Sequence, residues 1–472
     1  MENATKRIGM ASGSTHWEKA GMTQEEWKKA VKFDSTDWGW VIMSIGMAIG
    51  SGIVFLPVQV GLVGLWVFLA SAVISYPIMY GFQRLYINTL ASSSKCEDYA
   101  SVISGYLGKN WGFFLGIIYF IMIIMGVMMY STAITNDSAS FLYSFGVTDT
   151  ILSENPLYGL VIIVLLVAVA SRGEQILFKV STGMVLTKLI VIAILGAVMI
   201  PYWNLANVGA FPNWGYFIKE TIVMLPFTLC SILFIQSISP MVISYRTHNC
   251  NIEVAWYKSV RAMNIAFAVL FITVFFYAIS FNLAMGHDQA VEAAANNISS
   301  LAMAARGMEG NTLKILSLIL NIFAITTAFF GVFLGFREAC QGIAMNILRR
   351  MMPEELINKK TVSIGILIFA VLFSWGSNVL NFPVLSLLSF FGPIVGIIGC
   401  LIPAYLVHRV MFLHQYKGIM LNCIVLMGLL LLVSPFLRLL QQFTTFTLPR
   451  KLMKLVYTRP ELSPLDFLRF GP

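Results

Sequence analysis

Charged residues are scarce in this chain: they make up 11% of its 472 residues, whereas 58% are hydrophobic. An ordinary soluble domain has about 25% charged residues, so this composition excludes that class. Residues 1–37 contain no long hydrophobic run, and we therefore expect no cleavable signal peptide there. The hydrophobic runs that follow are typical of transmembrane helices. The sequence predicts an all-α polytopic membrane protein.

Cysteine and histidine are also few, with six and five residues. The predicted topology places every cysteine within a span or on the cytoplasmic side, where disulfides are rare. The histidines lie at or outside span ends and lack companions at metal-ligand spacing. We expect no disulfide, metal or cofactor. The net charge of +9 comes mainly from short loops between spans, so we expect no nucleic-acid partner.

Eleven hydrophobic runs have about the 20 residues needed to cross a bilayer. The predicted spans are 38–60, 65–86, 111–135, 156–170, 180–201, 221–245, 262–285, 313–335, 362–380, 383–407 and 419–437. Thr23 and Glu26 have capping-box spacing, which predicts a short helix in a cytoplasmic segment, 1–37, lying on the membrane surface. Residues 287–310 are polar and alanine-rich, and we expect short surface helices there.

The distribution of lysine and arginine predicts the orientation. With the N-terminus in the cytoplasm, the cytoplasmic segments hold 21 basic residues and the external segments hold three. The positive-inside rule supports this arrangement. Residues 438–472 form a basic tail with six more such residues. The tail lacks an uninterrupted twelfth span, and eleven spans would place it outside.

The first span contains Gly46, Gly50, Ser51 and Gly52. Each glycine within a helix costs about 1 kcal/mol relative to alanine. One interpretation is that the helix opens at 50–52 and offers free backbone groups to a ligand, as in transporters with discontinuous helices. The other is close helix packing, because Gly46 and Gly50 have small-residue spacing.

Span 6 contains a second interruption, predicted at residues 237–240, where Ser237 and Ser239 precede Pro240. Proline suits the first turn of a new helix, and serine is a natural cap. We expect free carbonyls near Gln236 and Ser237 that bind an ammonium group. Free N–H groups at 50–52, at the positive end of a half-helix, would bind a carboxylate.

The two interruptions lie five spans apart, so a second copy of a five-span repeat must be inverted in the membrane. We predict repeats at 38–201 and 221–407, with 419–437 as an added span. The interruptions would meet near the midplane and bind an amino acid zwitterion. Two unrelated structural kinks are the alternative.

Lys188 is the basic residue that lies well inside a span, about 13 Å from the cytoplasmic end of span 5. One hypothesis is that it binds and releases the coupling proton. The other is that it satisfies backbone carbonyls of span 1. Thr326 and Thr327 could add hydroxyl oxygens nearby or bond back to their own helix. Tyr130, near the expected outer end of span 3, could gate the site or lie at the membrane interface.

Three segments resemble the bacterial hydroxy and aromatic amino acid permease family: WVIMSIGMAIGSGIVFLPVQVGLVGLW (40–66), LPFTLCSILFIQSISPMVISY (225–245) and NIFAITTAFFGVFLGFREA (321–339). The resemblance covers residues 20–437, and the tail after Leu437 departs from it. The family belongs to the amino acid, polyamine and organocation superfamily, which implies the five-plus-five inverted-repeat fold. In that superfamily a span-5 lysine often stands where sodium-coupled relatives bind sodium, and Lys188 matches that position.

The resemblance is strongest to the serine-transporting branch. It implies import of D- or L-serine, with threonine or cysteine as further substrates, by proton symport across the bacterial inner membrane. Sodium coupling is the alternative within transport, and a non-transporting amino acid sensor is the alternative outside it. The residues show no cluster of nucleophile, base and orienting group, so we expect no enzymatic activity. The expected partners are the amino acid and the lipid bilayer, and the sequence leaves the oligomeric state open.

Overall fold

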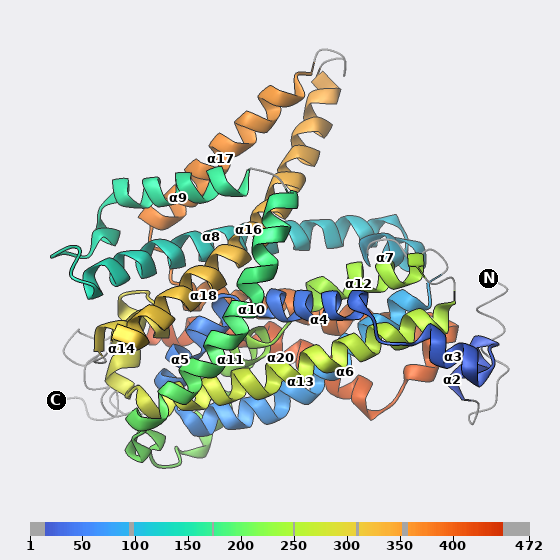
Figure 1. Ribbon diagram of the computed structural model, residues 1–472, viewed down its shortest axis with the longest axis horizontal. Helices are drawn as coiled ribbons and strands as arrows, with labels where there is room; N and C mark the ends of the chain where they lie inside the picture. Colours follow the sequence, from blue (N-terminus) through green and yellow to red (C-terminus); the bar gives the residue numbers. More distant parts are fainter. Residues whose placement is uncertain are drawn as a thin grey trace.

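The computed structural model describes residues 15–93, 99–171, 174–248, 251–307, 311–351 and 357–446. These residues form a bundle of helices and no strand (Figure 1). The helices are α2 (His16–Ala20), α3 (Gln24–Ala30), α4 (Ser35–Ala48), α5 (Ser51–Val63), α6 (Leu65–Ala91), α7 (Tyr99–Leu107), α8 (Lys109–Ser144), α9 (Pro156–Ala170), α10 (Glu174–Val198), α11 (Trp214–Ser231), α12 (Ile235–His248), α13 (Ile252–Ala284), α14 (His287–Ala295), α15 (Ser300–Gly307), α16 (Asn311–Met351), α17 (Lys359–Val379), α18 (Val384–Val395), α19 (Ile402–Arg409) and α20 (Ile419–Phe446).

The helices account for all eleven predicted spans. Nine spans among the described residues are long and apolar enough to cross a membrane, and α4 with α5 makes a tenth that bends by 43°. The remaining span is α9, whose 15 apolar residues reach only about 22 Å at 1.5 Å per residue. Pro156 occupies its first turn and the Asn155 side chain accepts a hydrogen bond from Leu157 N, so both set where α9 begins.

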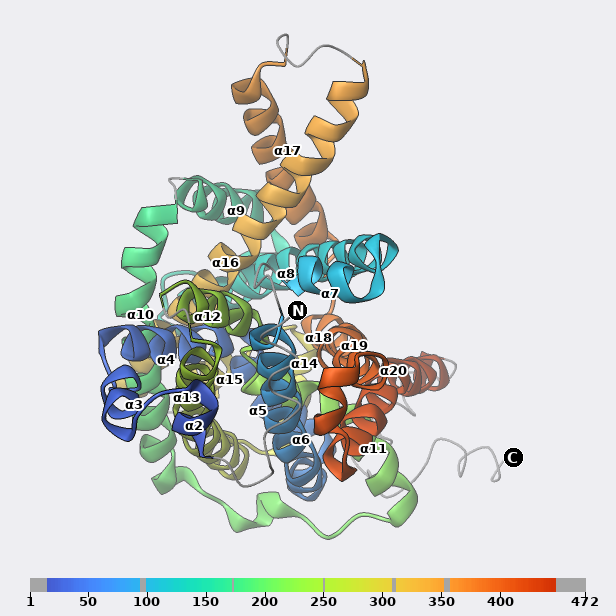
Figure 2. The ribbon, with the colours of Figure 1, turned by 90° about the vertical axis from the view of Figure 1, so that its right-hand side faces the viewer.

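The two halves of the bundle contain similar series of helices. The interrupted pair α4–α5 corresponds to α11–α12, and the long helices α6 and α8 correspond to α13 and α16. The two interrupted pairs pack against each other, α5 on α11 and α4 on α12. The fold is therefore an all-α inverted repeat with span 11, α20, added at the end. Figure 2 shows α16 and α17 projecting beyond the other helices.

The N-terminal helices are anchored to the bundle. The capping box of Thr23 and Glu26 is confirmed at the start of α3. The Asn251 side chain donates a hydrogen bond to Ala20 O, and His16 Nδ1 lies 3.0 Å from a Glu253 carboxylate oxygen. Both partners lie at the start of α13, so contacts with the bundle hold α2 in place.

The helices between spans 7 and 8 agree with the prediction only in part. Helix α14 forms as a surface helix with one buried face, because Ala290 and Ala293 are buried whereas Glu292 is exposed. Helix α15 differs from the prediction, because its residues 300–305 are all buried. The two helices pack against α5, α8 and α16. Their alanines let the short helices approach closely, as the contact of Ala290 with Gly61 shows. These helices therefore cover one end of the bundle, opposite the end that carries α2 and α3 (Figure 1).

The last helix extends beyond its predicted end. Helix α20 reaches Phe446, so the first residues assigned to the basic tail are helical. Arg438 belongs to this extension and donates a hydrogen bond to the Gln59 side chain at 3.2 Å. The rest of the predicted tail, residues 447–472, lies outside the described residues.

Candidate functional site: two helix breaks and a buried lysine

The first span opens at residues 49 and 50. Helix α4 ends at Ala48, and α5 begins at Ser51 with Gly50 as its N-cap and no side-chain cap. The predicted opening is confirmed but lies slightly earlier, since Ser51 and Gly52 already belong to the first turn of α5. The first N–H groups of a helix have no partner within it. The N–H groups of Ser51 and Gly52, at the positive end of α5, therefore point to an anion site.

Lys188 donates hydrogen bonds to the backbone carbonyl groups that lose their helical partners at this opening. In a continuous helix, Gly50 N–H would donate to Gly46 O, but here it donates to Ala48 O. Ile53 N–H likewise donates to Gly50 O instead of Ile49 O. Lys188 Nζ instead donates to Gly46 O at 3.2 Å and to Ile49 O at 2.9 Å.

The third hydrogen bond of Lys188 links span 5 to span 8. Lys188 Nζ donates to Thr327 Oγ1 at 2.9 Å, and that hydroxyl donates to Phe323 O on its own helix. The lysine is fully buried, and its three N–H donors have three acceptors. Lys188 therefore forms the hydrogen bonds expected of a lysine that binds the free backbone carbonyls of span 1. Thr327 joins this site, whereas Thr326 forms no side-chain hydrogen bond with the residues that the structure describes.

The second break lies earlier than predicted. Residues 232–234 separate α11 from α12, whereas Ser237, Ser239 and Pro240 lie within α12, so the predicted position at 237–240 is wrong. Ser237 explains the shift, because its N–H and its hydroxyl both donate to Phe234 O and close the first turn of α12. Pro240 has no N–H to donate to the carbonyl of Gln236 four residues earlier.

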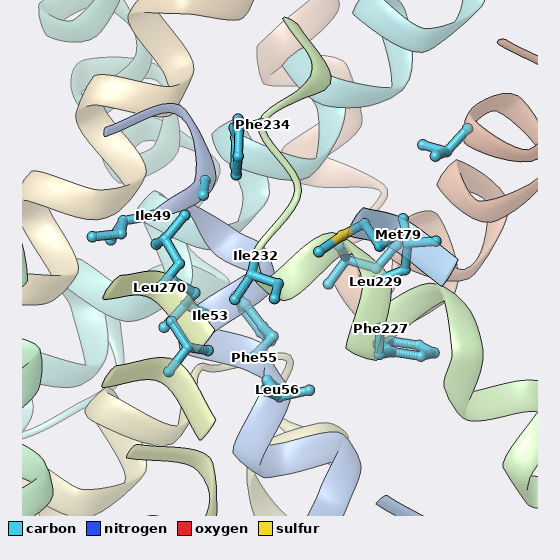
Figure 3. Close-up of a cluster of buried hydrophobic side chains, with 14 of the residues drawn as sticks. Ile49, Ile53, Phe55, Leu56, Met79, Phe227, Leu229, Ile232, Phe234 and Leu270 are labelled. Atoms are coloured by element: carbon cyan, nitrogen blue, oxygen red, sulfur yellow. The ribbon is translucent and has the colours of Figure 1, made fainter. Parts of the chain in front are cut away.

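The two breaks meet in space. A Cβ added to Gly52 would lie 2.6 Å from Cys230 O, so only glycine allows the start of α5 to lie against the end of α11. Ser44 and Ser237 hydroxyls are 2.9 Å apart and connect α4 to α12. Figure 3 shows buried side chains around this junction, including Ile53 and Ile232 from the two spans.

Of the remaining candidate site residues, some lie beside the first break and others do not. Tyr130 lies beside the first break, because a Cβ added to Gly50 would be 3.2 Å from its hydroxyl. It is not at the outer end of span 3, as predicted, since α8 continues to Ser144. By contrast, Gln236 and Pro240 are exposed on α12. At Gly46 the interpretation of close helix packing holds, because an added Cβ would collide with the Val185 side chain.

Asp137 is a buried acidic residue that the sequence reasoning missed. Its carboxylate accepts hydrogen bonds from Ser299 N at 2.8 Å and from the Asn321 side chain. These contacts join α8, the turn before α15, and α16. The predicted span 3 ended at residue 135, so Asp137 was placed outside it. An aspartate within a longer apolar run was the signal that could have identified it.

A second missed cluster lies at the start of α4. Asp37 is fully buried and accepts hydrogen bonds from Tyr245 Oη at 2.7 Å and Arg261 Nη2 at 3.0 Å. Asp34 caps α4, and Lys258 Nζ donates to its carboxylate at 2.6 Å. This hydrogen bond holds the pKa of Asp34 below its usual value. The cluster fixes α4 against α12 and α13.

The described residues contain no group of three or more His, Cys, Asp or Glu side chains that could hold a metal ion. Their four cysteines, Cys230, Cys340, Cys400 and Cys423, are free thiols. Cys96 and Cys250 lie outside the described residues.

Solved structures share the fold of this chain. The manganese transporter of Eremococcus coleocola aligns over 98% of this chain and 96% of its own, with a TM-score of 0.53 and 14% identity. MhsT in complex with L-phenylalanine aligns over 85% of this chain and 97% of its own, with a TM-score of 0.50 and 13% identity. The fold and the paired breaks define an all-α inverted-repeat membrane protein.

Sequence relatives identify the family. The serine transporter of Escherichia coli O157:H7 is 63% identical over 440 residues, which are 93% of this chain and 99% of the relative. The serine transporter SdaC of Escherichia coli K12 is 26% identical, over 88% of this chain and 96% of its own. No family model matches. The chain belongs to the hydroxy and aromatic amino acid permease family, and it is an amino acid transporter rather than an enzyme.

Proposed function

We propose that this permease imports serine, with threonine or cysteine as further substrates, by proton symport. The observation that carries the proposal is the contact between the two breaks, where the start of α5 meets the end of α11 at Gly52 and Cys230. The N–H groups at one helix end suit a carboxylate, and the carbonyls at the other suit an ammonium group. The names of the relatives support serine as the amino acid.

Lys188 carries the coupling proton in this proposal. Its ammonium group holds Gly46 O, Ile49 O and Thr327 Oγ1 together. A neutral amine has only two N–H donors, so loss of the proton leaves one acceptor without its hydrogen bond. Deprotonation would therefore loosen α4 and α5 from α10 and α16. These contacts support a coupling of proton release to alternating access, in which the interrupted spans rock around the substrate.

The three oxygens bound by Lys188 favour proton coupling over sodium coupling, because the lysine occupies the place that a sodium ion would need. Carbonyl and hydroxyl oxygens form the kind of ligand set that binds a hard cation such as Na⁺. Here the lysine ammonium supplies the positive charge between them. A sodium-coupled mechanism would have to place its ion elsewhere.

The distribution of basic residues supports a location in the bacterial inner membrane with the N-terminus in the cytoplasm. In this orientation α2 and α3 lie on the cytoplasmic side. Helices α14 and α15, at the opposite end of the bundle, then lie on the outer side.

The deciding experiment is uptake of labelled L-serine into proteoliposomes under an imposed inward proton gradient. D-serine, threonine, cysteine and tryptophan serve as competitors, and each assay is run with and without sodium at fixed pH. We expect accumulation that a protonophore abolishes and that sodium does not change. Sodium-dependent accumulation would contradict proton coupling, and binding without accumulation would indicate a sensor.

A further inference from the structure

A cavity of about 420 Å³ lies near the end of the bundle that carries α14 and α15. Small-molecule pockets commonly have volumes of about 300–1,000 Å³. Its walls come from α8, the turn before α9, the α14–α15 segment and the end of α17, and none of its residues belongs to either helix break. Seven of its twelve lining residues are polar or charged, so the cavity suits a hydrophilic ligand.

Arg306 supplies the positive charge of this cavity. Its Nε donates a hydrogen bond to Ser140 Oγ at 2.7 Å, and its Nη1 forms a long ion pair of 3.9 Å with the Glu292 carboxylate, too long for a hydrogen bond. Its guanidinium also lies over the Tyr143 ring. Its Nη2 is buried and has no hydrogen-bond partner among the described residues. Burial lowers the pKa of Arg306 from its usual value. The two Nη groups match the two oxygens of a carboxylate in a bidentate pair.

Asparagine side chains hold one wall of the cavity in place. The Asn136 and Asn297 side chains both donate to Asn381 Oδ1, at 3.1 and 3.0 Å, and Asn297 Oδ1 accepts from Val384 N. Asn297 and Asn381 are the described non-glycine residues with positive φ, 54° and 46°. Asparagine tolerates this conformation, which often marks functional sites. The wall is thus built before any ligand arrives.

We propose that this cavity is a second amino acid site, in which Arg306 binds the carboxylate. The ammonium group would face Glu154, whose exposed side chain lines the same cavity. This proposal rests on the proposed function, because it takes the transported amino acid as the ligand and the α14–α15 end as the outer side. The site holds substrate at the outer face, separate from the breaks where α5 meets α11.

Equilibrium dialysis of the purified full-length protein with labelled L-serine tests the site. The wild type has two small-molecule sites in this proposal, so we expect about two bound serine molecules per chain. Arg306→Gln removes one site, so we expect about one. Lys219→Gln is the matched control, because it removes an exposed positive charge that is also predicted on the outer side of the membrane. This variant should still bind about two serine molecules per chain. The carboxylate analogue 3-hydroxypropionate should displace the Arg306-dependent serine, and ethanolamine, which lacks the carboxylate, should not.

Equal serine binding by wild type and Arg306→Gln would overturn the second site, as would displacement by ethanolamine alone. Uptake at saturating serine should persist in Arg306→Gln, which shows that the variant is folded. If that variant is inactive, Glu154→Gln replaces it, and unchanged binding in this exposed-residue variant would equally overturn the site. Failure of the wild type to take up serine would instead refute the proposed function, so the two failures are distinguishable.

Discussion

Lys188 is the residue on which the proposed coupling depends. We expect Lys188→Ala to abolish serine accumulation driven by a proton gradient, because the alanine can neither carry the proton nor hold the Gly46 and Ile49 carbonyls. Each buried carbonyl left without a donor costs about 1–3 kcal/mol. Exchange of labelled for unlabelled serine without a gradient should remain measurable and serves as the folding check. Lys219→Ala is the control, since its side chain is 44% exposed. Accumulation at the wild-type level in Lys188→Ala would refute the role.

Asp137 illustrates a different role, that of joining helices within the bundle. Asp137→Ala would leave Ser299 N–H buried without its acceptor, and it would remove one of the two acceptors of the Asn321 amide. We expect a loss of about 1–3 kcal/mol in the free energy of unfolding. Thermal unfolding of the detergent-solubilised protein measures it, with hydrogen exchange reporting faster opening of α15. The exposed Asp149→Ala is the control, and equal stability of the two variants would contradict this assignment.

At the scale of elements, the approach of α5 to α11 depends on Gly52. In Gly52→Ala the new Cβ would lie 2.6 Å from Cys230 O, a backbone atom that moves only if the helices separate. Overpacking of this kind costs about 1–3 kcal/mol, so we expect serine uptake to fall by about tenfold or more. Gly39→Ala on α4 is the matched control, because a Cβ there meets no atom within 4 Å. A similar loss in both variants would show that the contact is unimportant.

The attachment of α4 to α13 should depend on pH through Asp34. The hydrogen bond from Lys258 lowers the pKa of Asp34 in the folded protein. Its contribution to stability is therefore present above the unfolded pKa of about 3.9 and is lost as pH falls through the lower folded pKa. Asp34→Asn retains a helix cap but removes the charge. We expect its melting temperature to lie below that of the wild type at pH 7, with the difference shrinking below about pH 4. A difference in melting temperature that stays the same from pH 7 to below pH 4 would contradict the predicted pH dependence.

At the scale of the whole molecule, the orientation in the membrane can be tested directly. Cysteine variants at Lys19, on α2, and at Asp149, in the turn after α8, place probes at exposed positions on opposite sides. In intact cells, an impermeant maleimide should label Asp149→Cys and should label Lys19→Cys only after permeabilisation. The background chain carries serine at its native cysteine positions. Labelling in the reverse pattern would overturn the cytoplasmic N-terminus.

The sequence by itself determined where the hydrophobic helices lie and that two of the spans are broken. Hydrophobic runs of about 20 residues, glycines at 46, 50 and 52, and the serine–proline pair near 240 are local signals. They act within a few residues of where they occur, so they can be recognised without knowledge of the neighbouring helices. Even so, they located the second break about five residues too late.

Only the tertiary structure decided which groups fill the spaces between helices. The acceptors of Lys188 lie on α4 and α16, the donors to Asp137 lie beyond α14 and on α16, and Arg306 faces a cavity built from four parts of the chain. These partners are far apart in sequence, and their approach depends on how each helix is rotated about its axis. Hydrophobic periodicity is weak where both lipid and protein interior are apolar, so the sequence could not specify those rotations.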